Sequence, residues 1–581
     1  MTMRDPWEAI GVSARGCGSG HGDPVDSVVS VISAPQARPV KYRARNDLPT
    51  PSGSDSVPRI EAPTPETPVD HRIPLPVCQP NPRADAGATG GAPREKCGVF
   101  AIWGGAEPAR STYFALYAQQ HRGQESAGMA ITDGASITSR VGMGLVPEVF
   151  SNRSIREMDE WALRDGRPDG AAGRLRGVIG HNRYSTTGGS ELLNAQPIVE
   201  SYVGGQVAVA HNGNIVNAMP IRRDFELQGR IFHSTSDTEV VVHLLASPEQ
   251  QSAPDPLAAS LRRLQGAFSM VFLFPDRIEA VRDPWGWRPL TLGEMPDGAP
   301  VVASETVALS AIGARTVRDV EPGEIVTLSD AGVTSRRFAE PAPRLAQCVF
   351  EHVYFASPAS EIFGQSVQIV REKLGERLAH ESPVDADYVM PMPDSGRSAA
   401  NGYARASGIP YREGIVPNRY VGRTFIKPTQ DARAAAVRLK LNVVAEIVRG
   451  RRLIVVDDSI VRGTTTKLKM AQLREAGALE IHLRISCPPI RFPCYFGVDF
   501  ADPSQLVAVG RSVEEITEFL GVDSLAFLSL DGLLACAQTE RVGREHFCAA
   551  CYDGVYRIDI EHPLSKGILE RGQMPMFSRT S

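Results

Sequence analysis

Two adjacent carboxylates, a glycine and several hydroxyl side chains follow one short apolar segment of the chain. Asp457 and Asp458 come directly after Leu453–Val456. The polar residues that follow are Ser459, Arg462, Gly463, Thr464, Thr465 and Thr466. Carboxylates suit a ribose diol and a magnesium ion, and hydroxyls beside a helix N-terminus favour phosphate. The pattern predicts a phosphate- and magnesium-binding loop, and the alternative is a solvated strand end followed by an ordinary turn.

The elements around this loop are those that would position such a site. The continuously apolar Leu453–Val456 is typical of a central parallel strand buried on both faces. Helical spacing predicts a helix over Lys467–Ala476, with Gly477 as its stop. Open α/β sheets bind ligands outside the carboxyl ends of their strands, which is where the acids lie.

This ordered string resembles the phosphoribosyl-pyrophosphate (PRPP) loop of type I phosphoribosyltransferases. The resemblance implies that Asp457 and Asp458 bracket the ribose hydroxyls and that the threonine-rich loop holds the 5-phosphate. It also implies a magnesium ion held by Ser395, Asp457 and Asp458, with Ser395 lying in the segment Met392–Gly396.

A second set of polar clusters begins at Cys97, which opens an apolar segment. A cysteine in such a place is more often a small buried side chain than a nucleophile. Arg183 could likewise form a surface ion pair, Asp237 could cap a helix, and His211–Asn214 could form a hairpin turn. Four clusters in order nevertheless favour chemistry, and they are His121–Glu125, Gly180–Thr186, His211–Asn214 and Ser236–Glu239.

In this order the clusters resemble the glutaminase domain of class II, N-terminal nucleophile, glutamine amidotransferases. The resemblance implies that Cys97 is the nucleophile, with its own α-amino group as the base after cleavage of the chain before it. Asn212 and Gly213 would stabilise the oxyanion. The implied glutamine-binding residues are Arg122, in a loop that closes over glutamine, and Arg183, Tyr184, Thr186 and Asp237.

The C-terminal pair Cys548–Cys551 is a C-x-x-C motif that alone could be redox-active, metal-binding or accidental. A class II glutaminase followed by a PRPP loop resembles the amidophosphoribosyltransferase family, from about residue 94 to residue 556. One branch of that family carries a [4Fe–4S] cluster, and the resemblance implies Cys348, Cys494, Cys548 and Cys551 as its ligands. A four-cysteine zinc site is the alternative on spacing, and Cys487 is interpreted as core packing.

The resemblance implies an enzyme that makes 5-phosphoribosylamine, glutamate and pyrophosphate from PRPP, glutamine and water, at the start of purine synthesis. Its expected cofactors are Mg²⁺ and the [4Fe–4S] cluster, and purine nucleotides are its expected feedback inhibitors. A homotetramer is also implied. Two rival hypotheses are another class II amidotransferase, such as a hexosamine-phosphate synthase, and a non-catalytic PRPP or purine sensor.

Length and composition agree with a soluble protein of two or three domains, because 581 residues exceed what one core supports. The net charge of -5 gives no reason to expect nucleic acid or a membrane surface, and nine scattered cysteines suggest a reducing, cytoplasmic compartment. The expected organisation is a disordered extension or propeptide over 1–96, an αββα glutaminase sandwich over 97–345, and a doubly wound phosphoribosyltransferase sheet over 346–581. Its linker lies near Glu340–Leu345, and two helices are expected at Asp237–Leu245 and Arg397–Ser407.

Overall fold

The computed structural model describes residues 97–162, 177–184, 191–418, 441–498 and 503–560, all within the compact unit Asp85–Ser581. The expectations for residues 1–96 and for Thr186 therefore lie outside the described residues. No helix in the described ranges is long and apolar enough to cross a membrane.

The first half of the described chain forms two antiparallel sheets. The first sheet has the order β11-β9-β10-β1-β4-β2-β3 and the second has the order β13-β12-β8-β7-β6-β5. The strands of the first sheet are β1 (Gly98–Trp103), β2 (Ser126–Thr132), β3 (Ile137–Met143), β4 (Gly177–Arg183), β9 (Thr291–Glu294), β10 (Pro300–Ala303) and β11 (Arg315–Asp319). Those of the second are β5 (Ile198–Tyr202), β6 (Gly205–Ile215), β7 (Gly266–Phe274), β8 (Arg277–Arg282), β12 (Glu324–Ser329) and β13 (Gly332–Arg337).

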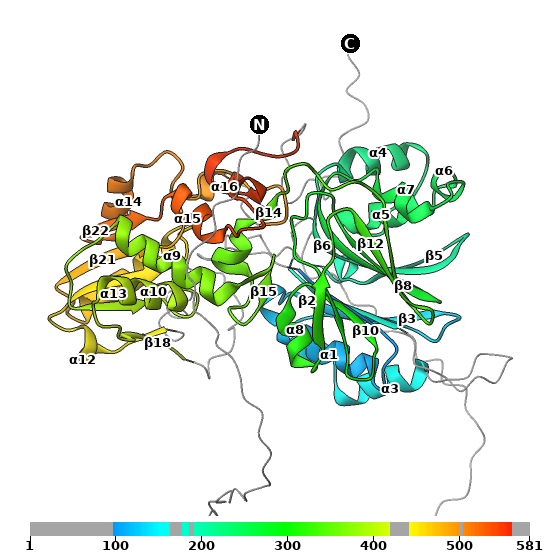
Figure 1. The fold of residues 1–581 in the computed structure, drawn as a ribbon, viewed down its shortest axis with the longest axis horizontal. Helices are drawn as coiled ribbons and strands as arrows, with labels where there is room; N and C mark the ends of the chain where they lie inside the picture. Colours follow the sequence, from blue (N-terminus) through cyan, green and yellow to red (C-terminus); the bar gives the residue numbers. More distant parts are fainter. Residues whose placement is uncertain (1–96, 163–176, 185–190, 419–440, 499–502, 561–581) are drawn as a thin grey trace, which may run out of the picture. The chain divides into compact units, whose positions relative to one another are not determined.

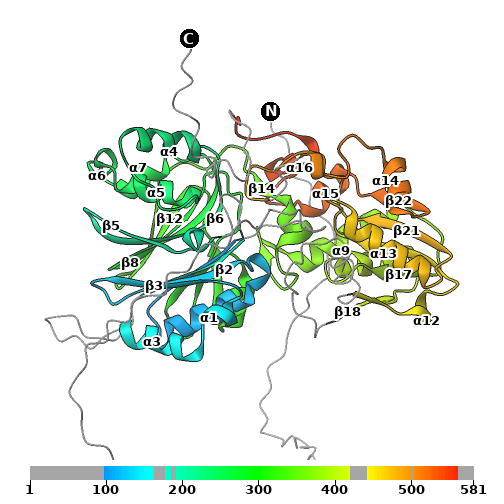
Figure 2. The same cartoon turned by 180° about the vertical axis from the view of Figure 1, so that it is seen from behind.

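Helices cover the outer faces of both sheets. Figure 1 shows α1 (Pro108–Ala118), α3 (Asn152–Ala162) and α8 (Thr306–Ala311) outside the first sheet, and Figure 2 shows the same layers from behind. The helices α4 (Ala218–Leu227), α5 (Asp237–Leu245) and α7 (Pro256–Leu261) lie outside the second sheet. Apolar side chains from the inner faces, among them Val99, Ile179 and Val271, fill the space between the sheets. The expected αββα sandwich is confirmed.

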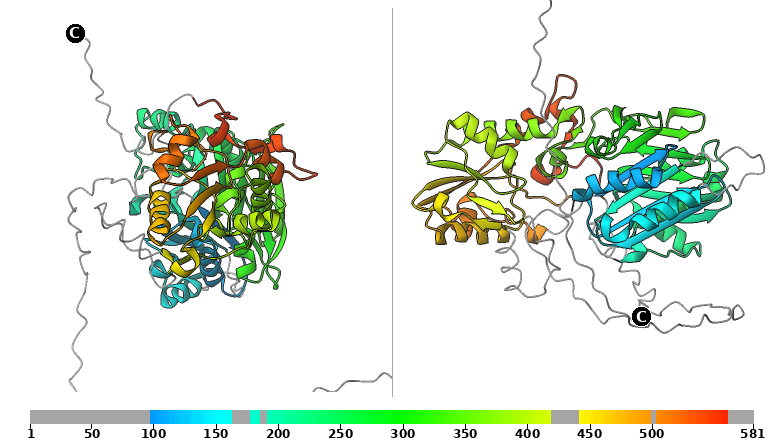
Figure 3. Two further views of the ribbon diagram at one scale, coloured as in Figure 1. Left: turned by 90° about the vertical axis from the view of Figure 1, so that its left-hand side faces the viewer. Right: turned by 90° about the horizontal axis from the view of Figure 1, so that it is seen from below.

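The second half contains a four-stranded parallel sheet with the order β17-β20-β21-β22. Its strands are β17 (Tyr388–Pro391), β20 (Arg452–Asp457), β21 (Glu480–Ile485) and β22 (Ser524–Phe527). Figure 3 shows helices on both faces of this sheet. The main helices are α9 (Val367–Glu381), α10 (Arg397–Ser407), α13 (Thr464–Glu475), α14 (Val513–Leu520) and α15 (Leu530–Ala537). The expected doubly wound sheet is confirmed.

The direction of winding reverses at β17. The chain leaves β17 through α10 and forms one parallel bridge, Val389 to Tyr411, at the free edge of β17. It then returns to add β20 on the other side of β17. After this bridge the chain forms only the short β18 (Ile415–Pro417), which pairs antiparallel with β19 (Leu441–Val443). Such a reversal places a ligand crevice at the carboxyl ends of β17 and β20.

Short elements join the two halves. The strand β14 (Gln347–Cys348) pairs in parallel with β23 (Phe547–Cys548), so that Cys348 lies beside Cys548. A π-helical turn, Glu351–Phe355, follows β14 directly, and the short helix α16 (Ala550–Asp553) follows β23.

Candidate active sites

Cys97 lies at the start of β1, in the middle of the first sheet. Its side chain is 6% exposed, and its Sγ lies 3.5 Å from the backbone oxygen of Tyr184. The backbone N–H of Val99 donates to Ser304 Oγ at 3.0 Å, and Asn212 Nδ2 donates to the same hydroxyl at 3.3 Å. Ser304 therefore links the strand that begins at the thiol to the expected oxyanion-binding residue. Sequence reasoning did not identify this serine, because a lone serine in an apolar context carries no signal.

Gly213 lies inside β6, two residues before its end, so the alternative of a hairpin turn over His211–Asn214 is wrong. Those residues pair in register with β7 as a continuous strand. Gly213 has φ +152, and a side-chain carbon there would lie 1.9 Å from the backbone oxygen of Ala267. Only glycine fits this position, beside Asn212.

Asp237 is the first residue of α5, and the helix cap is Ser236, whose side chain accepts from the Thr238 N–H. The carboxylate of Asp237 is therefore available for other contacts, and its Oδ2 accepts from the Ile215 N–H at 2.9 Å and lies 3.7 Å from His211 Nδ1. Burial alone would raise the pKa of Asp237, but the nearby His211, the Ile215 N–H and Arg183 together lower it. Asp237 is thus a buried, ionised carboxylate.

Arg183 ends β4 opposite Ser126 and is 2% exposed, so it is not a surface ion-pair residue. Its positive charge contributes to the low pKa of Asp237. A buried cation and a buried anion therefore lie near each other, next to the residue that contacts the Cys97 thiol. This is the charge pattern that an α-amino acid requires at its carboxylate and ammonium groups.

Arg122 does not occupy the mobile position expected for it. It lies in a 3-10 helix, Gln120–Arg122, with its side chain fully buried. Its Nε donates to the Cys97 backbone oxygen at 2.9 Å, and its other nitrogens pair with Glu305 and Glu351. Because all three nitrogens already have protein partners, the expectation that Arg122 contacts glutamine is corrected. It holds the backbone of Cys97 instead.

The two acids of the second motif lie at the carboxyl end of β20. Asp457 is 7% exposed and Asp458 is 4% exposed, so they do not form a solvated strand end. Burial and the adjacent Asp458 carboxylate raise the pKa of Asp457 well above its usual range. Ser459 Oγ donates to Asp458 Oδ2 at 2.6 Å. Two adjacent buried carboxylates are an arrangement expected of residues that bind a cation or a diol.

The hydroxyl-rich loop leads into α13. Gly463, at φ +73, precedes the helix, and no side chain caps the first turn. The N–H groups of Thr464, Thr465 and Thr466 therefore begin a twelve-residue helix at its positive end. Arg462 is half-buried, and its guanidinium pairs with Gln505.

The loop Met392–Gly396 lies directly against this site. The Met392 N–H donates to the Val456 oxygen at 2.8 Å. A side-chain carbon at Gly396 would lie 2.3 Å from that oxygen and 3.2 Å from Asp457 Cα. Ser395, half-buried in this loop, is therefore brought to the same strand end as the two acids.

Four cysteines from three separate segments lie together at the junction of the two halves. The pKa of Cys348 is raised to about 12, and that of Cys494 and Cys548 to about 11, mainly by burial and in part by a neighbouring thiol. The pKa of Cys551 is also raised, by burial and then by the other three thiols. Arg288 acts on Cys348 and Cys494 in the opposite direction. Among the described residues, no three His, Cys, Asp or Glu side chains converge on a single ion.

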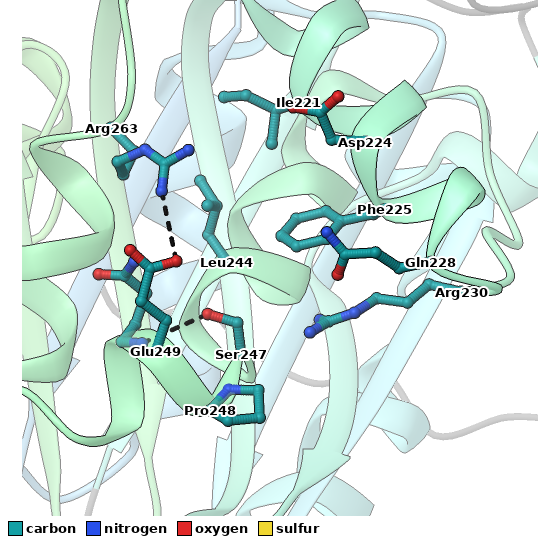
Figure 4. A pocket seen from close by; sticks show the side chains of 11 residues that line it. Ile221, Asp224, Phe225, Gln228, Arg230, Leu244, Ser247, Pro248, Glu249 and Arg263 are labelled. Atoms are coloured by element: carbon teal, nitrogen blue, oxygen red, sulfur yellow. Dashed lines mark hydrogen bonds and ion pairs between the residues drawn. The ribbon is translucent and has the colours of Figure 1, made fainter.

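Cys487 is fully buried, and its Sγ donates to the Pro488 oxygen at 3.3 Å, in agreement with core packing. A surface pocket shown in Figure 4 lies away from both motifs, between α4, α5 and α6 (Pro248–Gln251), and Arg263 and Glu249 form an ion pair at its edge. None of the expected site residues lines it.

Comparison with known proteins agrees with both motifs. Residues 181–311 match the model of a glutamine amidotransferase domain. The chain is 45% identical over 484 residues to the amidophosphoribosyltransferase of Synechococcus elongatus, covering 82% of this chain and 94% of that protein. It is 44% identical over 473 residues to the amidophosphoribosyltransferase of Bacillus subtilis, covering 80% and 95%. The solved structure of glutamine PRPP amidotransferase from B. subtilis, complexed with ADP and GMP, superposes with a TM-score of 0.71 at 43% identity, covering 80% of this chain and 98% of that one.

Proposed function

Since the chain belongs to the amidophosphoribosyltransferase family, we propose a division of its residues between two half-reactions. The enzyme converts PRPP, glutamine and water to 5-phosphoribosylamine, glutamate and pyrophosphate, the first committed step of purine synthesis. Glutamine hydrolysis is assigned to residues 97–345 and phosphoribosyl transfer to residues 346–581, with residues 1–96 as an extension or propeptide.

Cys97 is the nucleophile of glutamine hydrolysis. Its thiolate attacks the amide carbon of glutamine, the resulting oxyanion is stabilised by Asn212 Nδ2 and the Gly213 N–H, and ammonia leaves with a proton. Water then cleaves the thioester to release glutamate and restore the thiol. The observation that carries this assignment is the chain of hydrogen bonds Asn212–Ser304–Val99, which holds the oxyanion donor beside the strand that Cys97 begins.

The proton acceptor for the Cys97 thiol is the α-amino group of the same residue. A free α-amino group has a pKa of about 7.7–8.0 and is partly unprotonated at neutral pH. This role requires cleavage of the chain between Lys96 and Cys97, so that the mature enzyme begins with Cys97.

Glutamine is held by its two charged ends. Arg183 binds the α-carboxylate and Asp237 binds the α-ammonium group, which is supported by their burial and mutual proximity. Tyr184, whose backbone oxygen contacts the thiol, and Thr186, outside the described residues, line the pocket. Arg122 acts indirectly, through the carbonyl of Cys97.

PRPP binds at the reversal point of the parallel sheet. Asp457 and Asp458 accept hydrogen bonds from the ribose hydroxyls. The amides and hydroxyls at the start of α13 hold the 5-phosphate, with residues Ser459, Arg462, Gly463, Thr464, Thr465 and Thr466. Magnesium, held by Ser395, Asp457 and Asp458, would neutralise the charge of the pyrophosphate group. Ammonia from the glutaminase site attacks C1 of the ribose, and the C1–oxygen bond to pyrophosphate breaks.

The thiols of Cys348, Cys494, Cys548 and Cys551, which are buried or half-buried, fit a [4Fe–4S] cluster. Each thiolate of such a cluster binds a different iron, so that the sulfurs need not converge on one point. Tetrahedral zinc requires all four sulfurs at about 2.3 Å from one ion. Without a bound metal these neighbouring thiols resist ionisation, because their pKa values are raised. The positive charge of Arg288 favours their thiolate forms, and so would the positive charge of a bound cluster.

Iron analysis of anaerobically purified protein tests this cysteine assignment. We expect about four irons per chain, loss of iron and of brown colour in Cys548→Ser, and retention of both in Cys487→Ser. The two residues are both buried or half-buried cysteines, so Cys487→Ser controls for the loss of a thiol. Stoichiometric zinc in the unaltered protein would contradict the cluster.

Regulation by purine nucleotides is supported by the B. subtilis structure, which is complexed with ADP and GMP. A homotetramer stays a prediction. Coupled release of glutamate and pyrophosphate from glutamine plus PRPP tests the whole assignment. Release of glutamate without pyrophosphate would favour the hexosamine-phosphate type of amidotransferase, and no turnover in a folded protein would favour a sensor.

A further inference from the structure

Four buried charged side chains form one connected network between the two halves of the chain. They are Arg122, Arg288, Glu305 and Glu351, and each is at most 3% exposed. Glu351 is shared, because its Oε1 lies 2.8 Å from Arg122 Nη2 and 2.9 Å from Arg288 Nη1. The network holds two cations and two anions, and so its formal charge is balanced.

Each arginine of the network also donates to a backbone oxygen. At one end, Arg122 Nε donates to the oxygen of Cys97 at 2.9 Å. At the other end, Arg288 Nη2 donates to the oxygen of Phe496 at 2.7 Å. The proposed nucleophile is thereby connected to the segment that follows Cys494 through two arginines and one shared carboxylate.

The same segment also contacts the proposed oxyanion-binding strand. Asn214 Nδ2 donates to the Tyr495 oxygen at 2.9 Å. A side-chain carbon at Gly497 would lie 3.4 Å from Gly213 Cα. Residues Tyr495–Gly497 therefore form one wall behind β6, although they come from the second half of the chain.

We propose that Glu351 and Arg288 are positioning residues for glutamine hydrolysis, and that the glutaminase site is complete only when the segment Tyr495–Gly497 is in place. The inference rests on the proposed role of Cys97 as nucleophile. Glu351 orients Arg122, and Arg122 orients the backbone of Cys97. Because Cys97 provides both the thiol and the proposed base, rotation of its backbone displaces two reacting groups at once.

Arginine is required at position 288 because its planar guanidinium group donates to two acceptors in different directions, the Glu351 carboxylate and the Phe496 oxygen. A lysine keeps the charge but presents a single ammonium on a flexible stem, and so it cannot span Glu351 and Phe496 in the same way. Arg288→Lys therefore removes the geometry of the network while keeping its charge.

A purely structural role makes a different prediction, since a destabilised protein would lose all activities together. The enzyme offers an internal standard, because synthesis of phosphoribosylamine from added ammonia does not need Cys97. We expect Arg288→Lys and Glu351→Gln to lower the glutamine-dependent kcat by about tenfold or more, since misplacement by about 1 Å can cost about 100-fold. The ammonia-dependent kcat and the KM for PRPP should stay within about twofold of the unaltered enzyme.

Arg336→Lys is the matched control. Arg336 likewise donates to two acceptors, the carboxylates of Asp255 and Glu279, each at 2.7 Å, and has no ion pair with a residue of the network. Its variant should leave both activities unchanged. If Arg288→Lys does not fold, the double variant Arg288→Met/Glu351→Gln is used in its place with the same measurements. It removes one positive and one negative charge, so the network stays balanced. Equal loss of both activities, or unchanged glutamine-dependent kcat in folded variants, would overturn the proposal. Failure of Cys97→Ala to abolish glutamine use would instead refute the nucleophile assignment itself.

Discussion

Substitution of Gly213 by alanine tests the proposed oxyanion site most directly. The added carbon would lie 1.9 Å from the backbone oxygen of Ala267 and 2.8 Å from His211 Nε2. The Ala267 oxygen belongs to β7, whose pairing with β6 fixes it in place. The backbone of Gly213 must therefore move, and its N–H moves with it.

Two effects follow, and their magnitudes differ. A residue other than glycine in this positive-φ region costs about 1–3 kcal/mol of stability. Displacement of one oxyanion donor lowers kcat by about 100- to 1,000-fold, which is the cost of removing such a donor. We therefore expect a folded, somewhat less stable enzyme with glutamine-dependent turnover lowered by at least about 100-fold and ammonia-dependent turnover retained.

Pyrophosphate release with either glutamine or ammonia as nitrogen donor measures both rates in one preparation. Gly205→Ala is the matched control, because Gly205 begins the same strand at φ +112 and has no heavy atom within 4 Å of the added carbon. It imposes backbone strain without the collision. A folded Gly213→Ala protein with glutamine-dependent kcat within about twofold of the unaltered enzyme would refute the assignment of its N–H.

Three further outcomes are expected. Cys97→Ala should abolish glutamine-dependent synthesis and spare the ammonia-dependent reaction, and glutamate release by this variant would contradict the assignment. Intact-mass measurement of active enzyme should show a chain that begins at Cys97, whereas full activity with Lys96 still attached would show that the α-amino base is wrong. Asp457→Asn should lose synthesis with both nitrogen donors. Because the folded-state pKa of Asp457 is raised, its stabilising contribution is present below the unfolded pKa and lost as pH rises through the folded one. Asp457→Asn should thus have a higher Tm than the unaltered protein at pH 8, and this difference should shrink towards pH 4.

Local sequence signals predicted the elements that carry the sites. The helix expected over Asp237–Leu245 and the helix expected over Arg397–Ser407 have those bounds in the structure. Each has a clear end signal, because Ser236 caps the first and Gly408, at φ +72, ends the second. The strand before Asp457 was predictable for a similar reason, since a continuous apolar run of this length suits a buried parallel strand.

Interactions between distant segments were not predictable from such signals. Arg122 was assigned to glutamine because its motif lies among glutaminase clusters, but its partners Glu305 and Glu351 are 183 and 229 residues away. Ser304 and Arg288 were not predicted for the same reason. A buried polar side chain is recognised by its partners, and a single sequence does not show which segments meet.

The placement of these partners bears on how the two reactions are coordinated. Glu351 lies three residues after Cys348, and Phe496 lies two residues after Cys494. The segments that hold Glu351 and Phe496 therefore each contain a cysteine of the proposed cluster. A buried network of two arginines and two glutamates tolerates little adjustment, because an unpaired buried charge is costly. A change at the cysteines that shifts either segment must consequently be absorbed at Arg288 or transmitted to Arg122 and Cys97. We therefore expect substitution of these cysteines to impair glutamine hydrolysis through the segments that hold Glu351 and Phe496.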